Sequence, residues 1–356
     1  MAAEDSRGQT PLSRAALQGH LEVVQLFLDQ CDVGVNSEDD EGKIPLWYAF
    51  IRRDLSIAVI QLFLARDDIE VNSKDENNRT ALFHAAQRGD LEMVQLFLAR
   101  DDIEVNSRDE NNRTALFHAA QRGDLEMVQL FLAREDIEVN LKDRNGQSPL
   151  SCAVIRERFE VVQLLLARGD IDVNSKDEVG RSPLFYAVQQ GDLKNIQPLL
   201  ARSDLKVDSM DQFGRSPLSY AAEGRNVDIL LRLLSREDVD VNSKDQSGRS
   251  PFSYAASRGN FEVVQLFLTR GDTEVDPRDN SGRSPFSYAA ETGDFETVQL
   301  LWSRGDVDVN SEDESGRSPL SYATSGWNSE VVQLLLSSKD RSGRPPSSYA
   351  ADLEAV

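Results

Sequence analysis

The pattern of apolar and polar residues along the chain predicts pairs of short helices. In one copy, Ser182 is a suitable helix N-cap, and Pro183 takes the first helical position, where a missing backbone N–H costs nothing. Gly191 is the residue type best suited to a left-handed helix end, and Asp192 then caps a second helix. Four apolar residues at helical spacing follow: Leu193, Ile196, Leu199 and Leu200. Two short antiparallel helices are therefore expected.

A turn is expected after each helix pair. In the segment from Val173 to Gly180, Asp177 stands three residues before a glycine, which is tight-turn chemistry and predicts a projecting hairpin. A cation just after the second helix would complement its dipole. Such a cation recurs at Arg66, Arg100, Arg134, Arg168, Arg202, Arg236, Arg270 and Arg304.

This unit recurs ten times. Its opening Ser/Thr-Pro-Leu/Phe step, or a close variant, begins at Thr10, Ile44, Thr80, Thr114, Ser148, Ser182, Ser216, Ser250, Ser284 and Ser318. Every interval is 34 residues except the 36 between Ile44 and Thr80, and we expect the two extra residues in a longer inter-helix loop around 51–57. A partial eleventh repeat, 345–356, ends before a second helix, so we expect it to be the least ordered part.

These units are similar to a known repeat family. Gly8 to Ala16, Gly19 to Leu26 and the Val35-Asn36 step resemble the ankyrin repeat, over essentially the whole chain. The resemblance implies an all-α solenoid with short β-hairpin turns, a stack of ten repeats plus a truncated eleventh, in one domain over residues 1–356. Two features differ from the family: the unit has 34 residues rather than 33, and Ser, Phe or Trp replaces its usual His. The segment Ser216 to Ala222 is similar to ankyrin proteins of filamentous fungi.

The asparagine of the Val-Asn step has two interpretations. In animal ankyrin proteins, which this chain resembles, that position can be hydroxylated. The residue type itself favours a turn-stabilising role, and Asp208 and Asp276 replace two of the asparagines.

Charge limits the classes of partner. The 356 residues include 61 acidic and 39 basic side chains, a net charge of −22, which opposes binding to nucleic acid or anionic membranes. No apolar stretch approaches a membrane span, and the polar N-terminus has no signal-peptide core. We therefore expect a monomer in the cytoplasm or nucleus, not secreted, with another protein as its partner.

The chain shows no pattern typical of an enzyme or a cofactor site. Two cysteines, Cys31 and Cys152, provide neither a disulfide framework nor a zinc-ligand set. His84 and His118 stand one repeat apart in the same column, and we predict structural packing for them. No phosphate-binding glycine loop is present. We expect no catalytic residues, metal or cofactor.

Two columns of residues recur on the first helix and the turn before it. The first consists of Arg79, Arg113, Arg181, Arg215, Arg249, Arg283 and Arg317. These arginines either form ion pairs with turn aspartates such as Asp177, Asp211 and Asp245, or contact a partner. The second consists of Tyr186, Tyr220, Tyr254, Tyr288 and Tyr322, predicted to pack between repeats while each hydroxyl finds a hydrogen-bond partner.

Two turns carry an apolar residue at a position that is polar in most repeats. Where most repeats carry Asn or Ser before the turn glycine, Val179 and Phe213 stand instead, which indicates either a partner-binding pair or drift in a tolerant loop. The candidate partner-binding residues are Val179, Arg181, Gln189, Gln190, Phe213, Arg215, Arg249 and Arg283.

Three repeats lack the glycine between their helices. Glu157, Arg225 and Trp327 stand in its place, and we expect either a positive φ there or a remodelled helix end. Gly224 and Gly326 offer two of these repeats another cap, so we expect strain to be clearest at Glu157.

The pattern favours a protein-interaction scaffold or adaptor that binds through turn tips and the concave face of the first helices. One alternative is the sensing array of a larger multidomain signalling receptor. Another is an enzyme on an ankyrin scaffold. Such an enzyme would need titratable side chains that meet at one site, and no pattern in the sequence indicates such a site.

Overall fold

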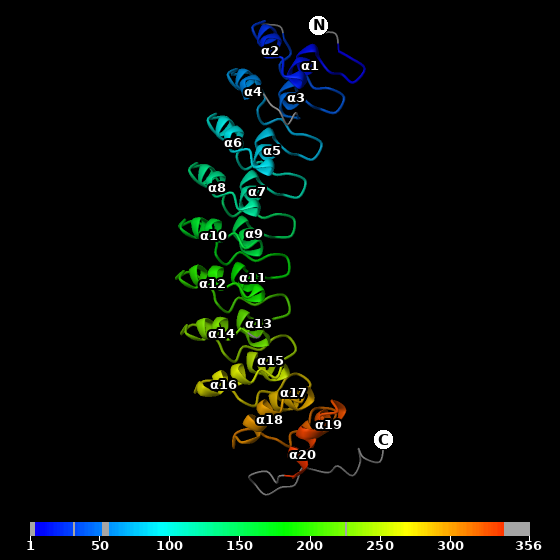
Figure 1. Ribbon diagram of the computed structural model, residues 1–356, viewed down its shortest axis with the longest axis vertical. Coiled ribbons are helices and arrows are strands. Elements are labelled where there is room, and N and C mark those ends of the chain that lie inside the picture. The colour runs from blue at the N-terminus through cyan, green and yellow to red at the C-terminus, as the bar shows by residue number, and fades with distance from the viewer. Residues whose placement is uncertain (1–3, 31–32, 52–56, 225, 338–356) are drawn as a thin grey trace. The chain divides into compact units, whose positions relative to one another are not determined.

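The computed structural model describes residues 4–30, 33–51, 57–224 and 226–337, and all regular structure in these ranges is helical. The chain divides into two compact units, Met1–Glu178 and Val179–Val356. In each unit, helix pairs stack in chain order, with odd-numbered helices in one layer and even-numbered helices in the other (Figure 1). The long turns project on the side of the odd-numbered helices (Figure 1). The single domain over residues 1–356 stays a prediction.

The described residues of unit 1 form five helix pairs. They are α1 (Pro11–Gln18), α2 (Leu21–Leu28), α3 (Pro45–Ile51), α4 (Ile57–Leu64), α5 (Ala81–Arg88), α6 (Leu91–Leu98), α7 (Ala115–Arg122), α8 (Leu125–Leu132), α9 (Pro149–Ile155) and α10 (Phe159–Leu166). The longer loop expected around 51–57 falls on residues 52–56, which lie outside the described residues.

Unit 2 contains five more pairs among its described residues. They are α11 (Pro183–Gln190), α12 (Leu193–Leu200), α13 (Pro217–Glu223), α14 (Val227–Leu234), α15 (Pro251–Ser257), α16 (Phe261–Thr269), α17 (Pro285–Thr292), α18 (Phe295–Trp302), α19 (Pro319–Ser325) and α20 (Ser329–Ser337). The partial repeat 345–356 and its expected disorder fall outside the described residues.

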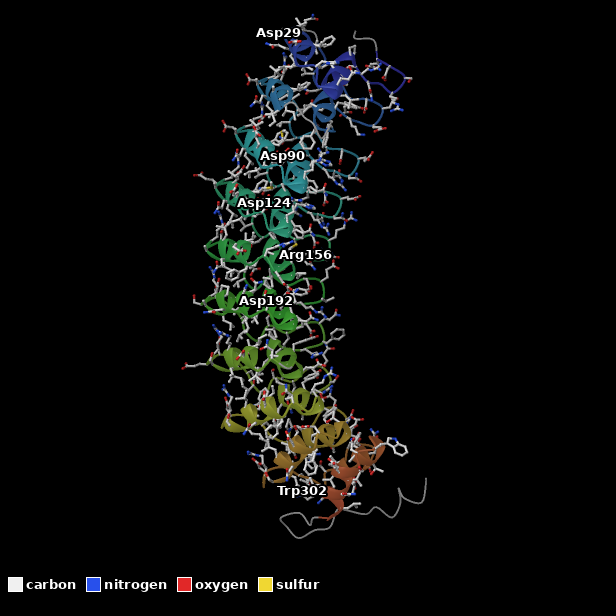
Figure 2. All side chains as sticks on the ribbon, viewed as in Figure 1. Asp29, Asp90, Asp124, Arg156, Asp192 and Trp302 are labelled. Atoms are coloured by element: carbon white, nitrogen blue, oxygen red, sulfur yellow. The ribbon has the colours of Figure 1, made fainter. Side chains whose placement is uncertain are left out.

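The predicted caps begin most helices. The Ser182 hydroxyl accepts the backbone N–H of Phe185 at the start of α11. Figure 2 labels three aspartates that begin second helices, Asp90, Asp124 and Asp192, and each accepts a backbone N–H of the first turn. These contacts satisfy N–H groups that have no partner inside the helix.

The inter-helix turn is left-handed with or without glycine. Gly89, Gly123 and Gly191 have φ of 80°, 80° and 75°, as predicted. Glu157 and Trp327 adopt φ of 57° and 60°, which is the positive-φ alternative of the expectation. Gly326 ends α19 with φ −80°, so Trp327 and not the glycine is left-handed, and the backbone is no more strained at Glu157 than at Trp327. Arg225 lies outside the described residues, but the cap of α13 is remodelled, because Gly224 has an extended backbone with φ −73°.

The core lies between the two helix layers. Phe97 and Phe131 in unit 1, and Phe267 in unit 2, each have 0% exposed surface. Burial of such a side chain stabilises the fold by about 1.5–3 kcal/mol. The apolar stripe of the second helices is therefore what joins each repeat to its own first helix and to its neighbours.

Arginines after the second helices also join adjacent repeats. The Arg100 guanidinium forms two hydrogen bonds with Asp102, at 2.8 and 2.7 Å, and donates to the carbonyl of Leu64, at 2.6 Å. Arg236 makes the same contacts with Asp238 and Leu200. The predicted complement to a helix C-terminus is thus present, but on the preceding repeat's helix.

The asparagine of the Val-Asn step clamps neighbouring repeats. Asn72 Nδ2 donates to the carbonyl of Asp102 at 2.7 Å, while Asn72 Oδ1 accepts the N–H of Glu104 at 2.8 Å. This geometry confirms the turn-stabilising role.

Candidate functional site

The turn tips of unit 2 are built around an aspartate. Asp211 Oδ1 accepts the backbone N–H groups of Phe213 and Arg215, both at 2.9 Å, and the backbone N–H of Asp211 donates to the Arg215 carbonyl at 3.0 Å. Gly214 closes the turn with φ 77°. The predicted turn chemistry is confirmed, and the described residues form tight turns here without regular strands.

Neighbouring tips are linked by backbone hydrogen bonds. The N–H of Gln212 donates to the carbonyl of Val179 at 2.8 Å, and the N–H of Gln246 donates to that of Phe213 at 3.0 Å. A Cβ on Gly214 would lie 3.0 Å from the Gln246 nitrogen, so this approach requires glycine in addition to the positive φ. The tips are therefore held at fixed positions relative to each other.

The two apolar tip residues differ in exposure. The Phe213 side chain is 53% exposed, whereas Val179 is half-buried. The expectation of an exposed apolar pair therefore holds fully only at Phe213.

Arginines and tyrosines alternate in a stack on the turn side of unit 2. The guanidinium carbon of Arg249 lies 4.0 Å from the ring centroid of Tyr254 and 4.4 Å from that of Tyr288. Arg283 lies 3.9 and 3.8 Å from Tyr288 and Tyr322. Arg215 begins the series, 3.6 Å from Tyr220 and 4.3 Å from Tyr254. Such cation–π contacts contribute about 0.5–2 kcal/mol each.

The hydroxyls of Tyr220, Tyr254, Tyr288 and Tyr322 each donate to the turn aspartate nine residues before the tyrosine. The Tyr254–Asp245 bond is 2.5 Å, and the Tyr288–Asp279 bond is 2.6 Å. Burial, with the Asp279 hydrogen bond, raises the pKa of Tyr288 to about 12, so its hydroxyl is a stable donor at neutral pH. The prediction that these hydroxyls find partners is confirmed.

The expected ion pairs between column arginines and turn aspartates are wrong for most of unit 2. Arg215 pairs with Glu223, Arg283 pairs with Glu291, and Arg249 donates to the Ser257 hydroxyl at 2.9 Å. Arg317 alone of these four pairs with its own turn aspartate, Asp313, at 3.1 Å. In the first three of these repeats the guanidinium lies between two tyrosine rings, which hold it away from the turn aspartate. Arg317 lies 4.7 Å from the Tyr322 centroid and reaches Asp313, although that aspartate also accepts the Tyr322 hydroxyl.

The remaining candidate residues occupy other parts of the repeats. Gln189 and Gln190 are exposed at the end of α11, far along the helix from the tip residues. Gln189 lines a cavity of about 340 Å³ together with Tyr220, Glu223 and Arg258. The Arg181 guanidinium lies 5.2 Å from the ring centroid of Phe185. The structure thus brings the arginines into one stack but does not join all eight residues in a single cluster.

Repeats three to five of unit 1 have a different column. His84, His118 and Cys152 stand where unit 2 has tyrosine. His84 Nε2 lies 2.9 Å from Asp75 Oδ2, and the His118 ring packs 4.7 Å from the Phe83 centroid. Burial lowers the pKa of His118 to about 4 and raises that of the Cys152 thiol to about 12. These are packing groups, as predicted for the histidines; Cys31 lies outside the described residues.

Among the residues that the structure describes, no group of three or more potential metal ligands occurs. Over the same ranges, the helices are too short and too polar for any of them to cross a bilayer.

Comparison with known proteins gives one result that covers most of the chain. A family model described as "Ankyrin repeats (3 copies)" matches residues 1–75, 52–143, 119–211, 184–279 and 252–344. A search among curated proteins finds no match.

Proposed function

The chain belongs to the ankyrin repeat family, whose repeats generally mediate protein–protein interaction, and from this premise we propose that it is a scaffold or adaptor whose partner contacts unit 2. The partner lies against the turn tips and the first-helix face of that unit. Its candidate contacts are Val179, Arg181, Gln189, Gln190, Phe213, Arg215, Arg249 and Arg283. The net charge of −22 supports a protein partner rather than nucleic acid.

The observation that carries this proposal is the exposure of Phe213. An aromatic side chain with 53% of its surface exposed contributes little to the core. Its backbone is fixed by the Asp211 turn and by the bond from Gln246. With the backbone fixed, only the two side-chain torsions of Phe213 remain to be ordered on binding, and this low entropy cost is typical of an interface anchor.

The arginine–tyrosine stack gives a second line of support. Arginine and tyrosine are enriched in protein interfaces. Here Arg215, Arg249 and Arg283 are half-buried between rings and therefore keep one orientation. A partner would meet an ordered surface and would not have to fix these long side chains.

A substitution at the tip tests the proposal. Asparagine occupies the corresponding tip in unit 1, at Asn145, so Phe213→Asn should fold normally. We expect it to weaken partner binding by about 10- to 30-fold, as loss of an aromatic anchor does. The wild-type chain and the variant are compared by affinity capture from native lysate with quantitative mass spectrometry, followed by calorimetry with the purified partner.

Asn145→Ser is the matched control, because it changes an exposed tip in unit 1. Circular dichroism checks the fold of both variants. A partner that binds Phe213→Asn as tightly as the wild-type chain would overturn the proposed surface.

A further inference from the structure

Three column arginines of unit 2, Arg215, Arg249 and Arg283, reach a shared position at the end of the first helix, eight residues further on. Glu223 and Glu291 stand at this position and form ion pairs with Arg215 and Arg283. In the repeat between them the position is Ser257, whose hydroxyl accepts from Arg249 at 2.9 Å. Serine has a hydroxyl and no carboxylate, so it offers the guanidinium a neutral oxygen in place of a charged one.

Arg249 has no carboxylate within 4.0 Å among the described residues, because two tyrosine rings hold its guanidinium and the position that it reaches carries Ser257. The neighbouring acids make other contacts. Asp245 accepts the Tyr254 hydroxyl and two backbone N–H groups. Glu223 binds both Arg215 and Arg258, and Glu291 binds Arg283. The positive charge of Arg249 is therefore not neutralised by an ion pair with any residue of unit 2 that the structure describes.

The guanidinium of Arg249 is also held in place. It lies between the rings of Tyr254 and Tyr288, and its buried Nε has no hydrogen-bond partner. Arg249 and Ser257 are each half-buried, so part of their surface faces solvent. A fixed, planar set of N–H donors beside a hydroxyl matches the geometry of a carboxylate.

We propose that Arg249 and Ser257 form a subsite for a glutamate side chain of the partner protein. The partner's carboxylate takes the place that Glu223 and Glu291 take in the adjacent repeats. It accepts from the Arg249 guanidinium in place of the Ser257 oxygen, while the Ser257 hydroxyl keeps its own hydrogen bond to the Tyr254 carbonyl at 2.9 Å. This inference rests on the proposed function and specifies the chemistry of the partner.

The direct test is nuclear magnetic resonance of the arginine Nε–H groups in the full chain. The probes are the capped tripeptides acetyl-Ala-Glu-Ala-amide and acetyl-Ala-Gln-Ala-amide, and Arg249→Lys assigns the Arg249 signal. We expect a saturable shift of that signal with the glutamate peptide, weakened by added salt, and none with the glutamine peptide. Equal shifts with both peptides, or no shift with either, would overturn the subsite.

Ser257→Glu tests the same site from inside the molecule. The new carboxylate should pair with Arg249, raise the unfolding temperature and weaken binding of the glutamate peptide at least tenfold. Ser303→Glu, an equal change at an exposed residue after α18, should leave binding unchanged. Unchanged peptide binding by Ser257→Glu would contradict the proposal.

Sodium phosphate is the remaining probe. A tighter saturable shift with phosphate than with the glutamate peptide would identify a phosphate subsite and reject the carboxylate. Partner capture that depends on Phe213 would survive a negative result at Arg249, so failure of the subsite and failure of the proposed function are distinguishable.

Discussion

Units 1 and 2 use the same helix pair and the same turn, yet one residue per repeat gives their turn-side columns different chemistry. Repeats three and four of unit 1 place His84 and His118 in the column, and repeats of unit 2 place Tyr254 and Tyr288 there. A tyrosine reaches the turn aspartate and also covers the neighbouring arginine. In unit 1, Tyr48 and His84 also bond to their turn aspartates, Asp39 and Asp75, so what distinguishes the tyrosines of unit 2 is their contact with the neighbouring arginine.

The arginines respond to this difference. In unit 1, Arg113 Nε lies 3.7 Å from Asp143 Oδ2 of the next turn, and its guanidinium is 5.6 Å from the Phe117 centroid. In unit 2, Arg249 lies between two rings and pairs with no acid among the described residues. The comparison teaches that the residue in the next column decides what a column arginine contacts. Beside a tyrosine the guanidinium stacks on the ring, and beside a smaller residue it lies near the aspartate of the next turn.

The largest expected difference between the two units is the loss of stability of unit 1 in acid. The pKa of His118 is lowered by burial to about 4, and that of His84 is lowered as well, so the folded state binds fewer protons than the unfolded state. Their contribution to stability is complete above pH 6.5 and falls as the pH drops from 6.5 to 4. For His118 the loss is about 3 kcal/mol, at 1.36 kcal/mol for each unit of pKa.

Native-state hydrogen exchange of the full chain measures this loss by region. Amides of α7 and α8 should lose protection over that pH range in excess of those of α15 and α16. His118→Phe removes the titrating group and should reduce the excess. Equal pH dependence in both regions would contradict the comparison.

Loss of one tyrosine hydroxyl should have the next largest effect. Tyr254→Phe deletes the 2.5 Å bond to Asp245 and leaves that carboxylate without one donor, which should destabilise the protein by about 1–3 kcal/mol. Phenylalanine at the same column position in unit 1, His118→Phe, replaces a ring whose Nε2 has no hydrogen-bond partner. This change should lower the free energy of unfolding by less than about 0.5 kcal/mol at pH 7. Urea unfolding at pH 7 compares the two, and equal costs would refute the role assigned to the hydroxyl.

The asparagine clamp between repeats can be tested by two opposite substitutions, Asp to Asn in unit 2 and Asn to Asp in unit 1. Asp208 Oδ2 accepts the N–H of Asp240 at 2.8 Å, but its buried Oδ1 has no partner, and burial raises the pKa of the carboxyl. Asp208→Asn in unit 2 should therefore stabilise by about 1 kcal/mol at pH 7, because an amide supplies the missing donor. Asn106→Asp in unit 1 should destabilise by a similar amount.

Protonation also turns a carboxyl into a donor. The gain from Asp208→Asn should therefore shrink as the pH falls towards 4. Thermal melts at pH 7 and pH 4 measure both variants, and a lower melting temperature for Asp208→Asn at pH 7 would reject this reading of the clamp.

Local rules predicted much of the fold, and contacts between repeats explain what they missed. The caps at Ser182 and Asp192 follow from residue type, because each acts on N–H groups a few residues away. The partners of Arg215 and Arg249 depend on tyrosine rings of two successive repeats, which lie on either side of each guanidinium. Arg-Tyr pairs five residues apart, with an aspartate nine residues before each tyrosine, were a usable signal for the stack. The unpaired state of Arg249 follows only from comparing Ser257 with Glu223 and Glu291.

The smallest expected effect is at the inter-helix turn of repeat five. Glu157 has φ 57°, where a side chain costs about 1 kcal/mol relative to glycine. Glu157→Gly should stabilise by about 0.5 kcal/mol, because the flexibility of glycine in the unfolded chain offsets part of the gain. Gly191 in unit 2 has φ 75°, so Gly191→Ala should destabilise. A melting temperature for Glu157→Gly below that of the wild-type chain would refute the strain at this turn.

Site-specific photocrosslinking tests the central claim, that unit 2 and not unit 1 carries the partner surface. A benzophenone amino acid is placed at position 213 in one sample and at the corresponding tip, 145, in another; both native side chains are exposed. The samples are irradiated with the partner captured by the wild-type chain. The account predicts a crosslink from position 213 and none from 145. A crosslink from 145 with none from 213 would contradict it.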